Sequence, residues 1–197
     1  MVIKRLGLAL LGVLLVLGCA TGVMNVSYTA KQEPPLKIDP IYLKVKDMRT
    51  DRSVLSPAVK AADIFAGGGI GYMDLDAKNP QGRSTQLKET SVEKAFEEAF
   101  RMRFGSRGLG LLPEAEGDKP ALIIEVERLY LDLADSSFKA EVSYLARFYK
   151  NGKEIHKERI SGRAERFKIL ARKTAEEAIS EAFTMSVNSL DLEAFQK

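Results

Sequence analysis

Few side chains in this chain could do chemistry, and its cysteine and histidine content limits which reactions are open to it. Cys19 is the only cysteine and His156 the only histidine among 197 residues. A catalytic triad needs a histidine beside its nucleophile, and a multi-histidine metal site needs several histidines. Once Cys19 is modified, no thiol remains for a disulfide, a thiolate metal site or a cysteine nucleophile. We therefore expect no cofactor, no metal and no catalytic residue, with His156 an ordinary surface histidine.

Carboxylates are the remaining candidates for acid–base chemistry. Asp47 and Asp51 flank Arg49, and Asp74 and Asp76 follow further along the same stretch. Two carboxylates at a suitable separation can cleave a glycosidic bond. Acids in a glycine-rich segment more often cap turns or pair with arginines. We expect the second role, in which Asp47, Arg49 and Asp51 form an ion-pair and turn-capping set and a candidate partner surface.

The start of the chain has the pattern of an export signal that ends at Cys19. Lys4 and Arg5 precede an apolar run, Leu6–Leu17, and the segment closes on Val-Leu-Gly-Cys. The run is shorter than the roughly 20 apolar residues that span a bilayer, which favours a cleaved signal peptide over residues 1–18. The Val-Leu-Gly-Cys ending resembles the lipobox of bacterial lipoproteins, which implies cleavage before Cys19 and acylation of that cysteine with chains such as palmitate. The alternative is an ordinary signal peptide that contains a cysteine by chance.

The residues after Cys19 bear on location and reach. Ala20, and not Asp, follows the cysteine, and under the usual enteric sorting rule this implies the periplasmic face of the outer membrane in a Gram-negative cell. Residues 19–40 are rich in Gly, Ser, Thr and Pro and read as a lipidated N-terminus and flexible tether of about 25 Å. Residues 41–197 are then expected to form a single domain.

The charge balance argues against nucleic acid as a partner. The chain has 30 basic and 27 acidic residues, and the first 18 residues hold two of the basic ones and no acidic one. Without them 28 basic residues face 27 acidic ones, so the mature chain is near neutral. A nucleic-acid binder needs a basic face. We expect the membrane, through acylated Cys19, and an envelope protein or lipid as partners.

Hydrophobic periodicity predicts the elements of the domain. A strand is expected from Ile41 and a helix over about 88–107. Two further strands follow, the first with a β-bulge near Glu127 or Arg128, and an Asn151-Gly152 turn leads into a third. A last amphipathic helix begins near Ala171. Residues 47–86 read as a long irregular loop, and we expect it to carry the specific function because it is too long for a bare connection in a compact domain. Its glycine run is not followed by the Gly-Lys-Ser/Thr of a phosphate loop, which favours a flexible loop over a phosphate site.

These elements predict an α+β fold. We expect a two-layer sandwich, in which a mainly antiparallel, twisted sheet of about four strands carries both helices on one face. The order is strand, long loop, helix, three strands, helix. The other face of the sheet would be open unless the loop or a partner covers it.

The chain also resembles the YajG family of bacterial envelope lipoproteins over most of the mature domain. The resemblance rests on short segments: the lipobox, Asp47-Met48-Arg49-Thr50-Asp51, Arg107-Gly108 after a helix, Leu129-Tyr130-Leu131-Asp132 and the Asn151-Gly152 turn. The stretch Gly67–Gly71 departs from the family pattern. The resemblance implies a lipid-anchored periplasmic protein without an assigned activity.

Two functions are consistent with these features. The first is a non-enzymatic lipoprotein with a partner-binding or envelope-assembly role. The second is an accessory of a transport system that binds a lipid or an envelope fragment. An enclosed apolar cavity would favour the second function, and an open sheet face the first.

Overall fold

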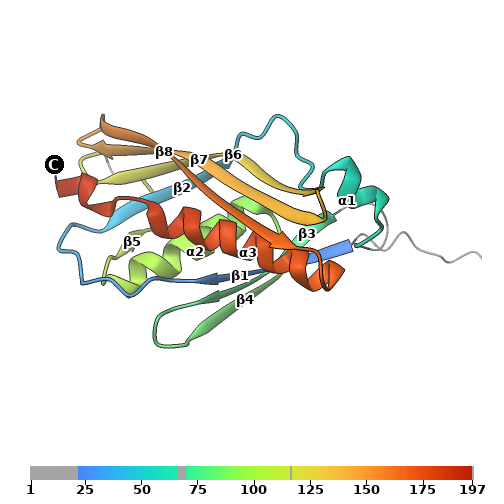
Figure 1. Cartoon of the computed structure of the whole chain (residues 1–197). Coiled ribbons are helices and arrows are strands. Elements are labelled where there is room, and N and C mark those ends of the chain that lie inside the picture. Colours follow the sequence, from blue (N-terminus) through green and yellow to red (C-terminus); the bar gives the residue numbers. More distant parts are fainter. Residues whose placement is uncertain (1–21, 66–69, 116, 197) are drawn as a thin grey trace, which may run out of the picture.

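The fold has three layers, with two long helices held between a large and a small sheet (Figure 1). The structure is a computed structural model that describes residues 22–65, 70–115 and 117–196.

The larger sheet has the strand order β5-β2-β6-β7-β8 and the smaller the order β1-β3-β4. The strands of the larger sheet are β2 (Ile41–Asp47), β5 (Leu111–Leu112), β6 (Ala121–Ala134), β7 (Ser137–Lys150) and β8 (Lys153–Phe167). The strands of the smaller sheet are β1 (Gly22–Thr29), β3 (Ile70–Lys78) and β4 (Ser84–Thr90). The helices are α1 (Pro57–Ala61), α2 (Val92–Ser106), α3 (Ala171–Ser189) and a terminal 3-10 turn, η1 (Leu192–Gln196).

The larger sheet is mixed. Strands β6, β7 and β8 form an antiparallel meander, whereas β2 runs parallel to both of its neighbours, β5 and β6. The register between β6 and β7 shifts between Val126 and Arg128, which confirms the predicted bulge. Asn151 and Gly152 have φ angles of 52° and 71°, as the predicted hairpin turn requires.

The predicted fold class is wrong. The described chain forms two mixed sheets of five and three strands, and not one mainly antiparallel sheet of about four strands. The helices pack on the larger sheet with one face and on the smaller sheet with the other: α2 contacts β2, β3 and β4, and α3 contacts β7, β8 and β1. The smaller sheet was missed because its strands come from two segments that read as a tether and as a loop.

Both of those segments are structured. Residues 22–29 of the expected tether form β1, and Met24, Val26 and Tyr28 are fully buried on one of its faces. The expected loop 47–86 contains α1 and β3, and β4 begins within it. Strand β3 pairs in parallel with β1 and antiparallel with β4. The domain therefore begins at or before Gly22, and deleting Gly67–Gly71 would remove the first residues of β3.

The two long helices supply the centre of the core. The helix predicted over about 88–107 is α2, which starts a few residues later than expected, with Ser91 as its N-cap, and which buries an apolar stripe. Phe96 of α2 lies 4.8 Å from Phe183 of α3 and 5.9 Å from Tyr144 of β7, between ring centroids and in edge-on geometries. Such contacts add to the stabilisation from burying apolar area. No helix among the described residues has the length and apolarity needed to cross a bilayer.

Helix α3 also covers the free edge of β1 with a row of polar side chains. The row recurs every fourth residue: Arg172, Glu176, Ser180, Thr184 and Asn188. These side chains bond backbone groups at alternate residues of β1 and just beyond it, namely Val23 O, Asn25 N, Ser27 N and O, Thr29 O and Lys31 N. Four helical residues rise about 6 Å and two strand residues about 6.6 Å. Each side chain of the row therefore lies opposite the next alternate residue of β1. These hydrogen bonds satisfy the backbone N–H and C=O groups at the edge of β1, which could otherwise pair with a strand of another chain.

Candidate functional site

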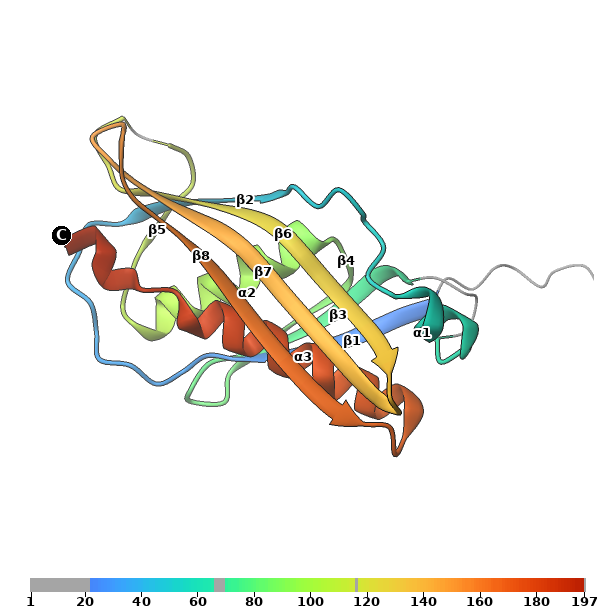
Figure 2. The ribbon, with the colours of Figure 1, turned by 45° about the horizontal axis from the view of Figure 1, so that its top comes forward.

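The face of the larger sheet that points away from the helices is the first candidate site. Side chains of β7 alternate, so that Phe138, Val142 and Tyr144 are buried toward the helices while Lys139 and Glu141 point to the other side. We call that other side of β6, β7 and β8 the outer face (Figure 2). Among the described residues, neither α2 nor α3 covers it, because both pack on the opposite side. In this respect the larger sheet has the open face that the sequence predicted, because neither long helix covers it.

Ion pairs run across the strands of the outer face. The carboxylate of Glu141 accepts from Arg128 Nε at 2.7 Å and from Arg163 Nη2 at 2.9 Å. Glu127 forms a two-pronged pair with Arg159, both contacts being 2.8 Å, and it raises the pKa of that guanidinium. The Arg128 guanidinium also lies 4.8 Å from the centre of the Tyr130 ring. Individually such exposed pairs stabilise little, but together they fix how the charges are displayed.

Two open hollows adjoin on this face and share Arg128 and Tyr130. The larger, of about 450 Å³, has walls in which three basic side chains face three acidic ones: Arg128, Lys139, Arg163, Asp132, Glu141 and Glu165. The smaller, of about 370 Å³, lies between the bulge of β6 and the segment that contains Thr50, Asp51 and Ser53. The charge balance in the larger hollow does not favour a polyanion. The larger hollow presents Tyr130 among arginine and acidic side chains, and tyrosine and arginine are enriched at protein interfaces.

The predicted set Asp47, Arg49 and Asp51 is divided by the structure. Arg49 is buried and forms a two-pronged pair with Asp47, whose contacts are both 2.8 Å. The Arg49 guanidinium lowers the pKa of Asp47, and the pair lies where the chain leaves the end of β2. Asp51 caps its own turn by accepting from Ser53 N and lies on the wall of the smaller hollow. Only Asp51 therefore belongs to a candidate partner surface.

The other acid and histidine candidates are dispersed. Asp74 pairs with Lys88 at 2.9 Å on the smaller sheet, and this contact lowers the pKa of Asp74. His156 is half-buried, with its ring 5.4 Å from that of Phe148, and is not the freely exposed side chain that the sequence predicted. Within the described part of the chain, no group of three or more His, Cys, Asp and Glu residues could hold a metal ion.

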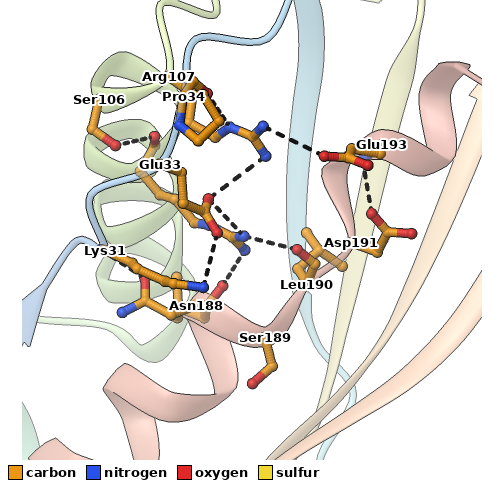
Figure 3. Close-up of polar contacts among 12 residues, drawn as sticks. Lys31, Glu33, Pro34, Ser106, Arg107, Asn188, Ser189, Leu190, Asp191 and Glu193 are labelled. Atoms are coloured by element: carbon orange, nitrogen blue, oxygen red, sulfur yellow. Dashed lines mark hydrogen bonds and ion pairs between the residues drawn. The ribbon is translucent and has the colours of Figure 1, made fainter.

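A second cluster of charges, around Glu33, is structural. Glu33 lies among three basic side chains: Lys31 at 3.5 Å, Arg103 at 3.2 Å and Arg107 at 3.6 Å (Figure 3). Arg103, which is buried, also donates to the backbone carbonyls of Val187 and Leu190 at the end of α3. It thus caps the free carbonyls of α3 from the last turns of α2. The cluster fastens the segment that follows β1 to the ends of both helices.

Cys19 lies outside the described residues, as does the signal peptide expected over 1–18. What the structure adds is the position of the residues that follow: β1 begins at Gly22, the third residue after Cys19. Three residues span at most about 10 Å. Sequence reasoning missed this proximity because it assigned the segment to a tether, although Met24, Val26 and Tyr28 already showed the period-two alternation of a strand.

No family model and no curated protein matches the chain, so the resemblance to the YajG family stays a prediction. A crystal structure of a Xanthomonas campestris protein of the DUF330 family is similar, with a TM-score of 0.51 and 12% sequence identity, over 84% of this chain and 89% of that one. A crystal structure of a candidate lipoprotein from Caulobacter crescentus CB15 aligns over 51% of this chain and 78% of that one, with a TM-score of 0.35 and 16% identity. At 12% identity, the first of these similarities shows a shared fold.

Proposed function

We propose that this chain is a non-enzymatic lipoprotein of the bacterial envelope, anchored through acylated Cys19 at the periplasmic face of the outer membrane, that binds a partner protein through the outer face. The observation that carries the proposal is the outer face itself, with its paired charges and two adjoining hollows centred on Arg128 and Tyr130. The lipobox-like ending at Cys19 and Ala20 after it support the anchor and its location. The finer assignment to the YajG family belongs to the same proposal.

The geometry of the outer face favours a protein partner. Tyr and Arg side chains at the centre of a surface are the residue types that carry most binding energy at protein interfaces. Glu141 orders Arg128 and Arg163 before any partner arrives, so binding would lose less side-chain entropy. The absence of a concentrated positive charge in the larger hollow favours a surface of mixed charge on the partner.

The alternative function, a carrier of a lipid or an envelope fragment, has less support. A carrier would need an enclosed apolar cavity. In the structure the layer between the sheets is occupied by α2 and α3, whose Phe96 and Phe183 are fully buried against each other. The two hollows on the outer face are lined by charges and open to solvent.

The anchor is tested by replacing Cys19. The wild-type protein should carry acyl chains on its N-terminal cysteine by mass spectrometry and should fractionate with outer membranes on a density gradient. Cys19→Ser should leave an unprocessed or soluble protein without acyl mass. Two or more chains hold a protein stably on a bilayer, so membrane-bound Cys19→Ser protein of unchanged mature mass would refute the anchor.

The outer face is tested by site-specific photocrosslinking in intact cells. A photoreactive amino acid at Ser161, exposed on β8 in the outer face, should give one discrete protein adduct, whereas the same group at Gln86, exposed on β4, should not. Glu141→Arg, which removes the common partner of Arg128 and Arg163, should abolish the Ser161 adduct while the protein stays folded and anchored. The same adduct from both positions, or an adduct that Glu141→Arg leaves unchanged, would contradict this proposal.

A further inference from the structure

The segment between β8 and α3 exposes apolar side chains in a way that stability does not explain. The described chain has seven exposed large apolar side chains, and three of them fall within the four residues Phe167, Lys168, Ile169 and Leu170. Phe167 is 65%, Ile169 80% and Leu170 60% exposed. We call these four residues the β8–α3 loop. Single exposed apolar residues are normal, but a cluster of them on a loop tip marks a contact with a partner or a membrane.

This loop lies at the end of the molecule where the N-terminal segment enters the fold. Arg172, two residues after the loop, donates from Nη2 to the carbonyl of Val23 at 2.8 Å. Val23 is the second residue of β1 and the fourth after Cys19. Figures 1 and 2 both show the start of α3 and the end of β8 at the end of the molecule where β1 begins. An acyl chain on Cys19 would therefore hold this end, and no other, against the bilayer.

The charges around the loop complement an anionic lipid surface. Lys168, Arg172 and Lys173 lie in the loop and the first turn of α3, which contains no acidic residue. Lys168 forms no ion pair with the described residues, whereas Arg172 pairs with Glu176 at 3.1 Å and Lys173 reaches Glu177 at 4.0 Å. The nearby acid Asp135 faces Lys139 at 3.5 Å. The positive end of the α3 dipole points the same way as the basic side chains and adds to their attraction for phosphate groups.

The N-cap position of α3 departs from what a helix in water requires. Leu170 occupies it, and its side chain cannot accept from the first N–H groups of the helix. The N–H of Leu170 itself donates to Thr174 Oγ1 at 3.2 Å. Ser, Thr, Asp and Asn are preferred at this position because they accept from those groups. Leu170 cannot make an N-cap hydrogen bond, and since it is 60% exposed it is not buried in the protein either. Its presence is explained if it is buried in something outside the chain.

We propose that the β8–α3 loop is a second membrane contact, in which Phe167, Ile169 and Leu170 enter the interface of the bilayer that acylated Cys19 anchors, while Lys168 and Lys173 meet anionic headgroups. This inference rests on the proposed lipid anchor. Trp, Phe and Leu side chains with adjoining basic residues form such interfacial contacts. Because β8 runs into the loop, two contact points would stand the strands upright on the membrane and turn the outer face sideways, where a partner on the same membrane can reach it.

The inference can be tested with tryptophan reporters, because the chain contains no tryptophan. The acylated Ile169→Trp protein is reconstituted into vesicles of phosphatidylethanolamine and phosphatidylglycerol. The emission of the new tryptophan should shift to the blue relative to detergent-free soluble protein, and lipids brominated near the headgroup end of the chain should quench most of it. The matched control is acylated Met185→Trp, which lies on an exposed face of α3 about 22 Å along the helix from the loop. The control should show neither the shift nor the quenching.

The outcomes separate the loop from the anchor. Flotation of both proteins with the vesicles, without quenching at position 169, would overturn the loop inference and leave the anchor standing. Quenching at position 169 in a protein whose mass shows no acyl chain would refute the anchor and support the loop. A melting temperature equal to the wild-type value confirms that each variant is folded. Ile169→Trp in which Lys168→Glu and Lys173→Glu are added should lose the quenching in phosphatidylglycerol-rich vesicles, and retention there would overturn the assigned role of these lysines.

Discussion

Helices α2 and α3 occupy the same layer, but their first turns follow different rules. Helix α2 begins at Ser91, whose side chain accepts from Lys94 N, and it has an acid, Glu93, in its first turn. Helix α3 begins at exposed Leu170 without a side-chain cap and has Arg172 and Lys173 where acids would suit the dipole. Elsewhere α3 is well fitted, with a buried apolar stripe and the polar row on β1. Local departures from the rules of stability are expected at functional sites. The start of α3 is therefore the part of the two helices that stability alone does not explain.

The largest expected effect is on the packing between the two helices. Phe96→Ala removes a fully buried ring that contacts Phe183 and Tyr144, and it should lower the free energy of unfolding by about 3–5 kcal/mol. Urea denaturation measures this loss. The matched control on the same helix is Arg101→Ala, whose side chain is largely exposed and should change stability by less than about 0.5 kcal/mol. A small effect of Phe96→Ala would show that the core closes around the gap.

A smaller loss is expected where α3 meets the larger sheet. Gly162 of β8 is buried against the helix, and a Cβ there would overlap the carbonyl of Ala182 and approach Ser186 N to 2.7 Å. Gly162→Ala should therefore destabilise by about 1–3 kcal/mol, because backbone must move. Gly105→Ala in α2 is the control: nothing lies within 4 Å of its Cβ position, and alanine favours a helix. A melting temperature that falls for Gly162→Ala and holds or rises for Gly105→Ala is the expected pair. Equal changes would refute the close approach of β8 to α3.

The sequence revealed the elements whose signals are local. The stripe of α2, the bulge in β6 and the Asn151-Gly152 turn each show within a few residues. The alternation of Met24, Val26 and Tyr28 was a local sign of β1, but its pairing with β3 was not predictable, because β3 lies far along the chain after a glycine run and no local pattern links Gly22 to Ile70. The polar row of α3 was invisible for a similar reason, since residues at every fourth position read as a solvated face until a strand edge is placed beside them.

The candidate site was predictable only in outline. An open sheet face follows from amphipathic helices on one side, and Asp51 was among the residues singled out. The centre formed by Arg128 and Tyr130 depends on the bulge, which brings a second outward-facing residue into β6 before the phase changes. The exposed β8–α3 loop could have been noticed, since Phe167, Ile169 and Leu170 stand directly before the predicted start of the helix near Ala171, and no Ser, Thr, Asp or Asn lies among residues 167–170.

The smallest predicted effect tests the comparison most directly, because two substitutions at equivalent positions should act with opposite signs. Ser91→Ala removes the cap of α2 and should destabilise the protein by about 1 kcal/mol. Leu170→Asp supplies α3 with the cap and first-turn acid that it lacks and should stabilise by a similar amount, at most about 1 kcal/mol. For a chain of this length each change corresponds to about 2–4 °C in melting temperature, which calorimetry of the protein in detergent-free buffer resolves. If Leu170→Asp destabilises instead, Leu170 contributes to the fold, and its exposure is not a sign of an outside contact. If it stabilises but the protein then loses its ordered orientation on vesicles, the leucine at the start of α3 is retained for the membrane at the expense of the helix.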